Sequence, residues 1–115
     1  VLNLGSVCVA PDLILTLPCG IDHLKAAMDG NGVEYAVCVN ETESVLGVIC
    51  RSLVETAERN EDIEKLLIKP LSQETNIQAA IPKLADSEAP IPIVRSGSEL
   101  VGIITQKSIL RALSS

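Results

Sequence analysis

Aromatic residues are almost missing from the sequence, which contains no Trp, no Phe and a single Tyr. This excludes a base-stacking platform for single-stranded nucleic acid, because such a platform needs several rings. Basic residues are also too few to neutralise a phosphate backbone, since nine Lys and Arg residues stand against fifteen Asp and Glu residues and the formal net charge is −6. We therefore predict that nucleic acid is not a partner.

Clustered metal ligands are missing as well. The four cysteines, Cys8, Cys19, Cys38 and Cys50, form no Cys-x-x-Cys pair, and the chain has one histidine, His23. We expect buried, reduced structural thiols in a reducing compartment. His23 is expected to face solvent from a helix, with no metal or catalytic role.

A membrane-spanning run is not found either. Residues 1–17 are apolar, but Asn3, Pro11 and Asp12 interrupt them and no basic segment comes first. They predict neither a signal peptide nor direct membrane insertion. Because the chain does not begin with Met, we expect it to be part of a longer protein.

Val, Ile and Leu are abundant, and they are arranged in a repeat. Its two copies are Ala36–Val39 with Leu46–Cys50, and Ile91–Val94 with Val101–Thr105. When the two copies are aligned without a gap, Gly47 falls on Gly102 and Ile49 on Ile104. Half-domains of this size bury too little apolar surface to be stable alone, so the repeat predicts two halves sharing a core.

Hydrophobic periodicity predicts the order helix, strand, strand, helix in each half. The predicted first-half elements are a helix over residues 20–30, strands over 35–39 and 45–50, and a helix opening near residue 52. The predicted second-half elements are a helix carrying Ile77, Ala80, Ile81 and Leu84, strands over 91–95 and 100–105, and a closing helix carrying Ile109, Leu110 and Leu113. Pro82 should kink or shorten its helix, because it has no backbone N–H.

Three patterns predict where helices begin. Ser52 followed by Glu55, and Thr75 followed by Gln78, have the spacing of a capping box. Asn60 is expected to cap a short helix between the halves.

The fold class that follows is α+β, with two short β-sheets packed with α-helices in a pseudo-twofold arrangement. We expect a first repeat over residues 1–59, which includes an N-terminal extension, and a second over residues 60–115.

The most specific residues for a family resemblance lie in the second repeat, where Pro92–Val94 is followed by Leu100–Thr105. With a helix on either side, and with a more divergent copy in the first half, this pattern resembles a tandem pair of CBS domains, a Bateman module. The resemblance covers residues 17–113. It implies a regulatory module that forms a homodimer through its helices. No nucleophile and base, carboxylate pair or metal cluster can be assembled from the residues, so we predict no enzyme activity.

A narrower resemblance is to the C-terminal CBS pair of the ATP-binding subunit of glycine betaine/proline ABC importers. The segments that carry it are Glu34–Val37, Gly47–Ile49 with Ser52–Leu53, Leu66–Leu71, and Gly102–Thr105 with Leu110–Leu113. It implies modulation of osmoprotectant transport in response to ionic strength or a ligand. The partners would be an ATPase domain and a membrane permease, and the location would be cytoplasmic, at the membrane through the parent transporter.

Two other functions stay open. One is an adenine-nucleotide-sensing CBS module of another enzyme or channel, and the other is a dimerisation scaffold without a ligand. The chain itself has no Gly-rich phosphate loop ending in Lys-Ser or Lys-Thr, so it cannot hydrolyse ATP by that route.

The CBS resemblance implies an adenine nucleotide as the candidate ligand, bound in a cleft between the repeats. CBS pairs place a Gly-h-x-Ser/Thr-x-x-Asp phrase there; in Gly102–Ser108, Thr105 matches the hydroxyl and Ser108 replaces the carboxylate. Losing charge-assisted hydrogen bonds weakens affinity by about tenfold to a hundredfold. The candidate ligand-binding residues are Thr105, Ser108, Leu71, Ser72, Pro90 and Ile91. Alternatively, the Thr105 hydroxyl only caps the closing helix.

Acidic residues gather between the two halves, at Glu55, Glu58, Glu61, Asp62 and Glu64. They form either a solvated surface or a surface whose interaction with a partner changes with salt, because screening shortens from about 10 Å at 0.1 M to about 3 Å at 1 M.

Overall fold

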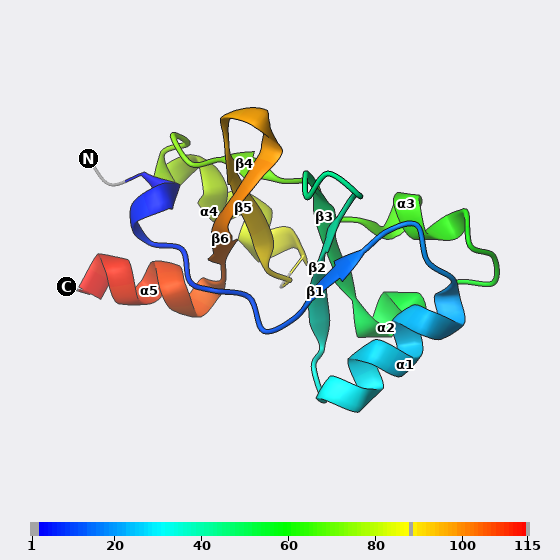
Figure 1. Cartoon of the computed structure of the whole chain (residues 1–115). Helices are drawn as coiled ribbons and strands as arrows, with labels where there is room; N and C mark the ends of the chain where they lie inside the picture. Colours follow the sequence, from blue (N-terminus) through cyan, green and yellow to red (C-terminus); the bar gives the residue numbers. More distant parts are fainter. Residues whose placement is uncertain (1–2, 88, 115) are drawn as a thin grey trace.

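The apolar strands pair into two three-stranded sheets, one in each half of the chain (Figure 1). The computed structural model describes residues 3–87 and 89–114, apart from the side chain of Ser87, so residues 1–2 of the first expected repeat, and Glu88 and Ser115 of the second, lie outside the described residues. The strands are β1 (Ile14–Thr16), β2 (Tyr35–Val39), β3 (Val45–Cys50), β4 (Leu71–Ser72), β5 (Ile91–Arg95) and β6 (Glu99–Ile104). In both sheets the first strand runs parallel to the second, and the second runs antiparallel to the third.

Helices flank the sheets, which confirms the α+β class and the repeated element order. They are α1 (Ile21–Asn31), α2 (Arg51–Val54), α3 (Asp62–Leu66), α4 (Ile77–Ser87) and α5 (Gln106–Ser114). The predicted first helix is confirmed within one residue at each end. Gly32 ends it with φ 64° and ψ 31°, a left-handed conformation that glycine adopts without strain.

The predicted capping residues Ser52 and Thr75 are wrong, by two residues and by one residue respectively. Helix α2 begins at Arg51, with Cys50 at the capping position and no side-chain hydrogen bond there. Helix α4 begins at Ile77, where the Gln78 backbone N–H donates to Asn76 Oδ1 over 2.8 Å. An Asn side chain reaches this N–H as well as a Thr does, so the spacing alone did not identify the capping residue.

Pro82 lies inside α4, on its exposed side, and the helix continues to Ser87. The predicted shortening is therefore wrong, and the alternative, a kink at Pro82, stays a prediction. The opposite side of α4 stays packed through Ile77, Ala80 and Leu84, which are all buried. This packing holds the helix in place although Pro82 lacks a donor.

Asn60 caps a different helix from the one predicted. Its Oδ1 accepts a hydrogen bond from the Ile21 backbone N–H over 3.1 Å, so it caps α1 from 39 residues away. The short helix α3 begins after it, without a side-chain cap bond at Glu61. Asn60 thus joins the start of the second repeat to the first helix.

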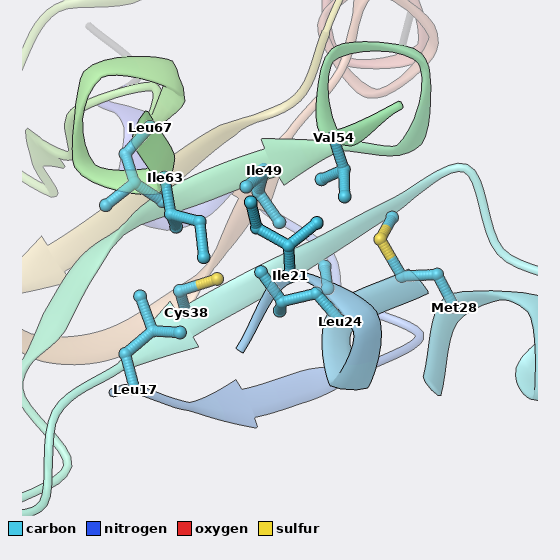
Figure 2. Close-up of a cluster of buried hydrophobic side chains, with 10 residues drawn as sticks. Leu17, Ile21, Leu24, Met28, Cys38, Ile49, Val54, Ile63 and Leu67 are labelled. Carbon is cyan, nitrogen blue, oxygen red and sulfur yellow. The ribbon is translucent and has the colours of Figure 1, made fainter. Parts of the chain in front are cut away.

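Within residues 3–87 and 89–114, buried apolar side chains form three clusters. Figure 2 shows the first-half core, in which side chains from the helices meet the sheet; its buried members are Leu17, Ile21, Leu24, Met28, Ala36, Cys38, Ile49, Val54, Ile63 and Leu67. The second-half core contains Leu4, Ile77, Ala80, Leu84, Ile91, Ile93, Ile104 and Ile109. The third cluster joins the two sheets through Val37, Val39, Val45, Val48 and Ile103.

The N-terminal segment packs on the second half before the chain crosses to the first (Figure 1). Leu4 is fully buried in the second-half core, and its N–H donates to the Thr75 carbonyl over 3.0 Å. Val9 and Ile103 exchange two backbone hydrogen bonds of 2.8 Å. The second core is therefore completed by residues of the N-terminal extension of the first repeat.

The start of the second repeat packs on the first half in the same way. Ile68 and Val48 exchange two backbone hydrogen bonds, of 2.8 and 3.0 Å. The neighbouring glycine of each repeat, Gly47 or Gly102, lies under the crossing segment. A Cβ on Gly47 would lie 2.6 Å from the Ile68 carbonyl oxygen, and one on Gly102 would lie 2.7 Å from the Val9 carbonyl oxygen. The repeated glycine thus makes room for a crossing backbone.

Candidate functional site

A cleft of about 440 Å³ lies between the two halves, at the start of β2 and β5 and the end of β3 and β6. Ligand pockets in proteins commonly have volumes of about 300 to 1,000 Å³. The residues that line the cleft are Glu34, Tyr35, Cys50, Ser52, Ala89, Pro90 and Thr105. Both halves contribute to it, so its shape depends on how they pack together.

Four of the residues that line the cleft occupy equivalent positions in the two repeats. In the ungapped alignment that places Gly47 on Gly102, Tyr35 corresponds to Pro90 and Cys50 to Thr105, and all four residues line the cleft. Pro90 and Thr105 were among the predicted site residues, whereas Tyr35 and Cys50 were not. Aligning the two predicted residues on the first repeat identifies Tyr35 and Cys50, whereas it does not identify the remaining lining residues Glu34, Ser52 and Ala89.

Charge and burial set the chemistry of this cleft. Among the described residues, the one charged residue in its lining is Glu34, whose carboxylate lies 4.0 Å from the Arg51 guanidinium. Arg51 also pairs with Asp29. Burial raises the pKa of Tyr35, with a smaller contribution from the Asp12 carboxylate, and burial raises the pKa of Cys50. The phenol and the thiol are therefore neutral hydrogen-bonding groups at pH 7.

Thr105 and Ser108 bind each other at the start of α5. The Ser108 N–H donates to Thr105 Oγ1 over 3.0 Å, and the Thr105 N–H donates to Ser108 Oγ over 2.9 Å. The Ser108 hydroxyl also lies 3.0 Å from the Thr105 carbonyl oxygen. This is a reciprocal capping box, and it confirms that Thr105 caps the closing helix.

The other predicted site residues lie apart from the cleft lining. Leu71 and Ser72 form β4, which pairs with β5 at Ile93 and Val94. Ile91 is buried in the second-half core. Ser108 lines a separate surface hollow, with residues 6–9 and the end of α5. The cleft thus contains Pro90 and Thr105 from the predicted set.

We expect Thr105→Ala to lower the free energy of unfolding by about 1 kcal/mol, the usual cost of losing an N-cap hydroxyl. Thr105→Ser keeps the hydroxyl and should stay within about 0.5 kcal/mol of the original chain. Urea unfolding of the three proteins, followed by circular dichroism, measures both differences. Equal stability of the Ala and Ser variants would show that the cap contributes nothing.

The structure buries Cys38 as predicted, leaves Cys8, Cys19 and Cys50 only partly buried, and exposes His23 as predicted. All four cysteines are free, and burial raises the pKa of the Cys38 thiol to about 12, with the neighbouring Cys19 as a smaller cause. His23 is exposed on α1. The described residues bring together no group of three or more His, Cys, Asp or Glu side chains suited to a metal ion. Across residues 3–87 and 89–114, no helix has the length and hydrophobicity needed to cross a membrane.

Comparison with known proteins gives one family match and several similar structures. Residues 68–115 match the family model of the CBS domain. No curated protein matches the sequence.

Three solved structures illustrate the similarity in fold. The cystathionine β-synthase pair domain of a putative Mg²⁺ transporter from Shewanella oneidensis has a TM-score of 0.75 at 18% identity, and the match covers 100% of this chain and 73% of that one. The Arabidopsis thaliana CBS-pair protein CBSX2, in complex with AMP, has a TM-score of 0.75 at 16% identity, with 99% and 97% covered. Staphylococcus aureus OpuCA has a TM-score of 0.72 at 15% identity, with 95% and 97% covered. The chain has the fold of a CBS domain pair, and its residues 68–115 match the CBS domain family.

Proposed function

We propose that this chain is the regulatory CBS pair of the ATP-binding subunit of a glycine betaine/proline ABC importer, with one repeat over residues 1–59 and another over 60–115. The four segments that resemble such importers support the proposal, and the similarity in fold to OpuCA agrees with it. The chain would not itself catalyse a reaction. It would change the activity of the ATPase domain and permease, at the cytoplasmic side of the membrane.

We propose ionic strength as the signal, because the capping box at the start of α5 already uses the hydroxyl groups that a nucleotide would need. The Thr105 and Ser108 hydroxyls bind backbone N–H groups of their own helix, and no carboxylate stands where CBS nucleotide sites place one. Glu34, the charged residue in the cleft lining, would repel a phosphate. Salt does, in contrast, directly screen the electrostatic interaction between exposed acidic residues and a partner surface.

The signal would act by shifting the population of dimer arrangements. We propose a homodimer formed through the helices of the CBS pair. A change in ionic strength can shift such an equilibrium only if the charges of the two copies lie closer together in one arrangement than in the other. The arrangement favoured at high salt would then change how the attached ATPase domains meet.

A second candidate function is sensing of an adenosine-containing ligand, and the cleft itself favours it. Its 440 Å³ volume, the Tyr35 ring and the neutral Thr105 and Cys50 side chains suit a small polar molecule with an apolar face. CBSX2, which has the same fold, binds AMP.

The transporter that contains this chain, reconstituted in lipid vesicles, tests the proposed function. ATP hydrolysis by the intact transporter should change with KCl concentration, and deletion of this module should remove that change. An unaltered KCl response after the deletion contradicts the role. A gene in which the module adjoins an unrelated enzyme or channel contradicts the importer assignment.

A further inference from the structure

A second hollow lies within the first half, and its lining residues differ from those of the cleft between the halves. Its volume is about 710 Å³, within the usual range of ligand pockets. The turn before α1, the turn between β2 and β3, and α3 surround it. Leu17 and Ile63, two members of the first-half core (Figure 2), and the half-buried Leu46 give it apolar walls. We call the hollow between these three residues and α3 the α3 pocket.

The two halves can be compared at this place through their crossing segments. Ile68 crosses β3 in the first half as Val9 crosses β6 in the second. The same number of residues earlier in each segment, Ile63 and Leu4 are buried in the two corresponding cores. Helix α3 therefore occupies in the first half the place that residues 4–6 occupy in the second.

These two segments are held in different ways. In the second half, the backbone of residues 4–5 donates two hydrogen bonds of 3.0 Å to carbonyls of residues 73–75, which brings the two segments into direct contact. In the first half the segment is helical, and the Ile63 N–H donates to the Asn60 carbonyl within it over 3.2 Å. Its described hydrogen bond to the start of α1 comes from the Ile21 N–H to Asn60 Oδ1. Because the helix uses its own N–H groups, it stands off from the turn before α1 and leaves the pocket.

The charged groups of the pocket are acidic. Glu61 and Glu64 line it, and among the described residues its lining contains no lysine or arginine. Arg59 lies 3.6 Å from the Glu61 carboxylate at the surface and offsets part of its charge. Glu64 has no ion-pair partner within the described chain. The pocket therefore attracts a positive group and repels a negative one.

The neutral polar groups do not reverse this preference. Asn40 Oδ1 accepts hydrogen bonds within its own turn, and Asn60 Oδ1 accepts the bond from Ile21. This bond also occupies the first N–H of α1, so the start of that helix is not free to bind an anion. Burial raises the pKa of the Cys19 thiol, which is therefore neutral at pH 7. The carboxylates are the strongest acceptors in the lining.

We propose that the α3 pocket binds a small organic cation, an ammonium group carried on a short apolar body. The ammonium lies beside the Glu61 and Glu64 carboxylates, and the apolar body covers Leu17, Leu46 and Ile63. The bound molecule fills the space between α3 and the turn before α1, so it holds the start of the second repeat on the first half. This ligand is distinct from the adenosine-containing candidate for the cleft, and the site does not depend on the importer assignment.

Three molecules with the same hexyl body and different charges test the proposal: hexylammonium, hexan-1-ol and hexanoate. Titration of the isotope-labelled chain at pH 7, followed by NMR, gives their dissociation constants and the residues whose signals shift. We expect hexylammonium to bind at least about tenfold more tightly than hexanoate, with hexan-1-ol between them. Attraction to an exposed carboxylate contributes about a factor of three, and repulsion contributes about as much in the opposite direction. The backbone amide signals of Cys19 and Ile63 should shift saturably.

Cys19 also reports occupancy chemically, because its partly buried thiol belongs to the lining. Hexylammonium should slow the alkylation of Cys19 by N-ethylmaleimide in proportion to the occupied fraction, as measured by peptide mass spectrometry. Cys50 is the internal control, since it is also partly buried but lines the cleft between the halves. Its rate of alkylation should stay unchanged.

Glu64→Gln removes one charge and keeps the shape of the side chain. It should weaken the binding of hexylammonium about threefold and leave that of hexan-1-ol unchanged. Glu58→Gln is the matched control, because Glu58 is exposed in the same acidic segment but lies outside the lining. It should leave the affinities for both molecules unchanged.

Three results would overturn the proposal in different ways. Hexanoate binding as tightly as hexylammonium overturns the class of ligand. An equal loss of hexylammonium affinity in the Glu64 and Glu58 variants overturns the site, since it shows a general attraction to an acidic surface. Unchanged alkylation of Cys19, or no saturable shift with any of the three molecules, overturns the α3 pocket as a binding site.

Discussion

Gly47→Ala should lower the free energy of unfolding by about 3 kcal/mol or more, although it adds a single methyl group. The new Cβ would lie 2.6 Å from the Ile68 carbonyl oxygen and 2.9 Å from Leu67 Cβ. One of these neighbours is backbone, so the crossing segment must move, and its two hydrogen bonds with Val48 would be strained or lost. Urea unfolding measures the loss.

Gly30→Ala is the matched control and should have the opposite sign. Gly30 lies inside α1, and a Cβ there would have nothing within 4 Å. Alanine is favoured over glycine within a helix by up to about 1 kcal/mol, so this variant should be more stable than the original chain. Gly102→Ala should be costly as well, since Val9 lies as close to it as Ile68 lies to Gly47. If Gly47→Ala were neutral, the crossing segment would not be tightly packed.

Leu4→Ala should destabilise the second repeat by about 2 to 5 kcal/mol, the usual cost of truncating a buried leucine. Leu4 is 0% exposed in the second-half core. It packs there with α4, which begins only at Ile77 and is therefore distant from Leu4 in the sequence. Ile14→Ala removes a similar side chain that is 49% exposed, and it should cost less than about 1 kcal/mol.

Thermal or urea unfolding compares these two variants, and amide exchange shows where the effect falls. Exchange in Leu4→Ala should quicken at Ile103, which is hydrogen-bonded to Val9 in the same segment. Equal small losses in both variants would mean that the N-terminal segment frays at little cost and does not complete the second core.

Local periodicity was enough to predict the strands and the long helices. The stripe of Ile21, Leu24 and Met28 and the strand over residues 35–39 depend on neighbours in the chain, and the structure confirms them. Helix starts were predicted less well, because a capping side chain one residue away reaches the same N–H, as Asn76 shows. Asn60 was assigned to the wrong helix because its partner, Ile21, lies 39 residues away.

Aligning the two copies of the repeat predicts more of the cleft lining than the second copy predicts alone. Pro90 and Thr105 were predicted from the second repeat, and aligning the two copies leads from them to Tyr35 and Cys50 in the same cleft. The repeated glycines were recognised as part of the pattern, but their role was not, since it depends on segments that cross between the halves. The Thr105 and Ser108 pair illustrates the opposite case, because residues suited to a ligand are held by their own helix.

Thermal melting of the chain with and without AMP, over a KCl series and at two protein concentrations, tests the claim that the signal is ionic strength. A ligand at about 100 times its dissociation constant stabilises the folded state by about 2.7 kcal/mol, which is easily seen in a domain of this size. We predict a melting temperature that rises with KCl, rises more at the higher protein concentration, and is unchanged by millimolar AMP. A saturable shift with AMP, together with no effect of protein concentration at any KCl, would contradict the account and make the cleft a nucleotide sensor.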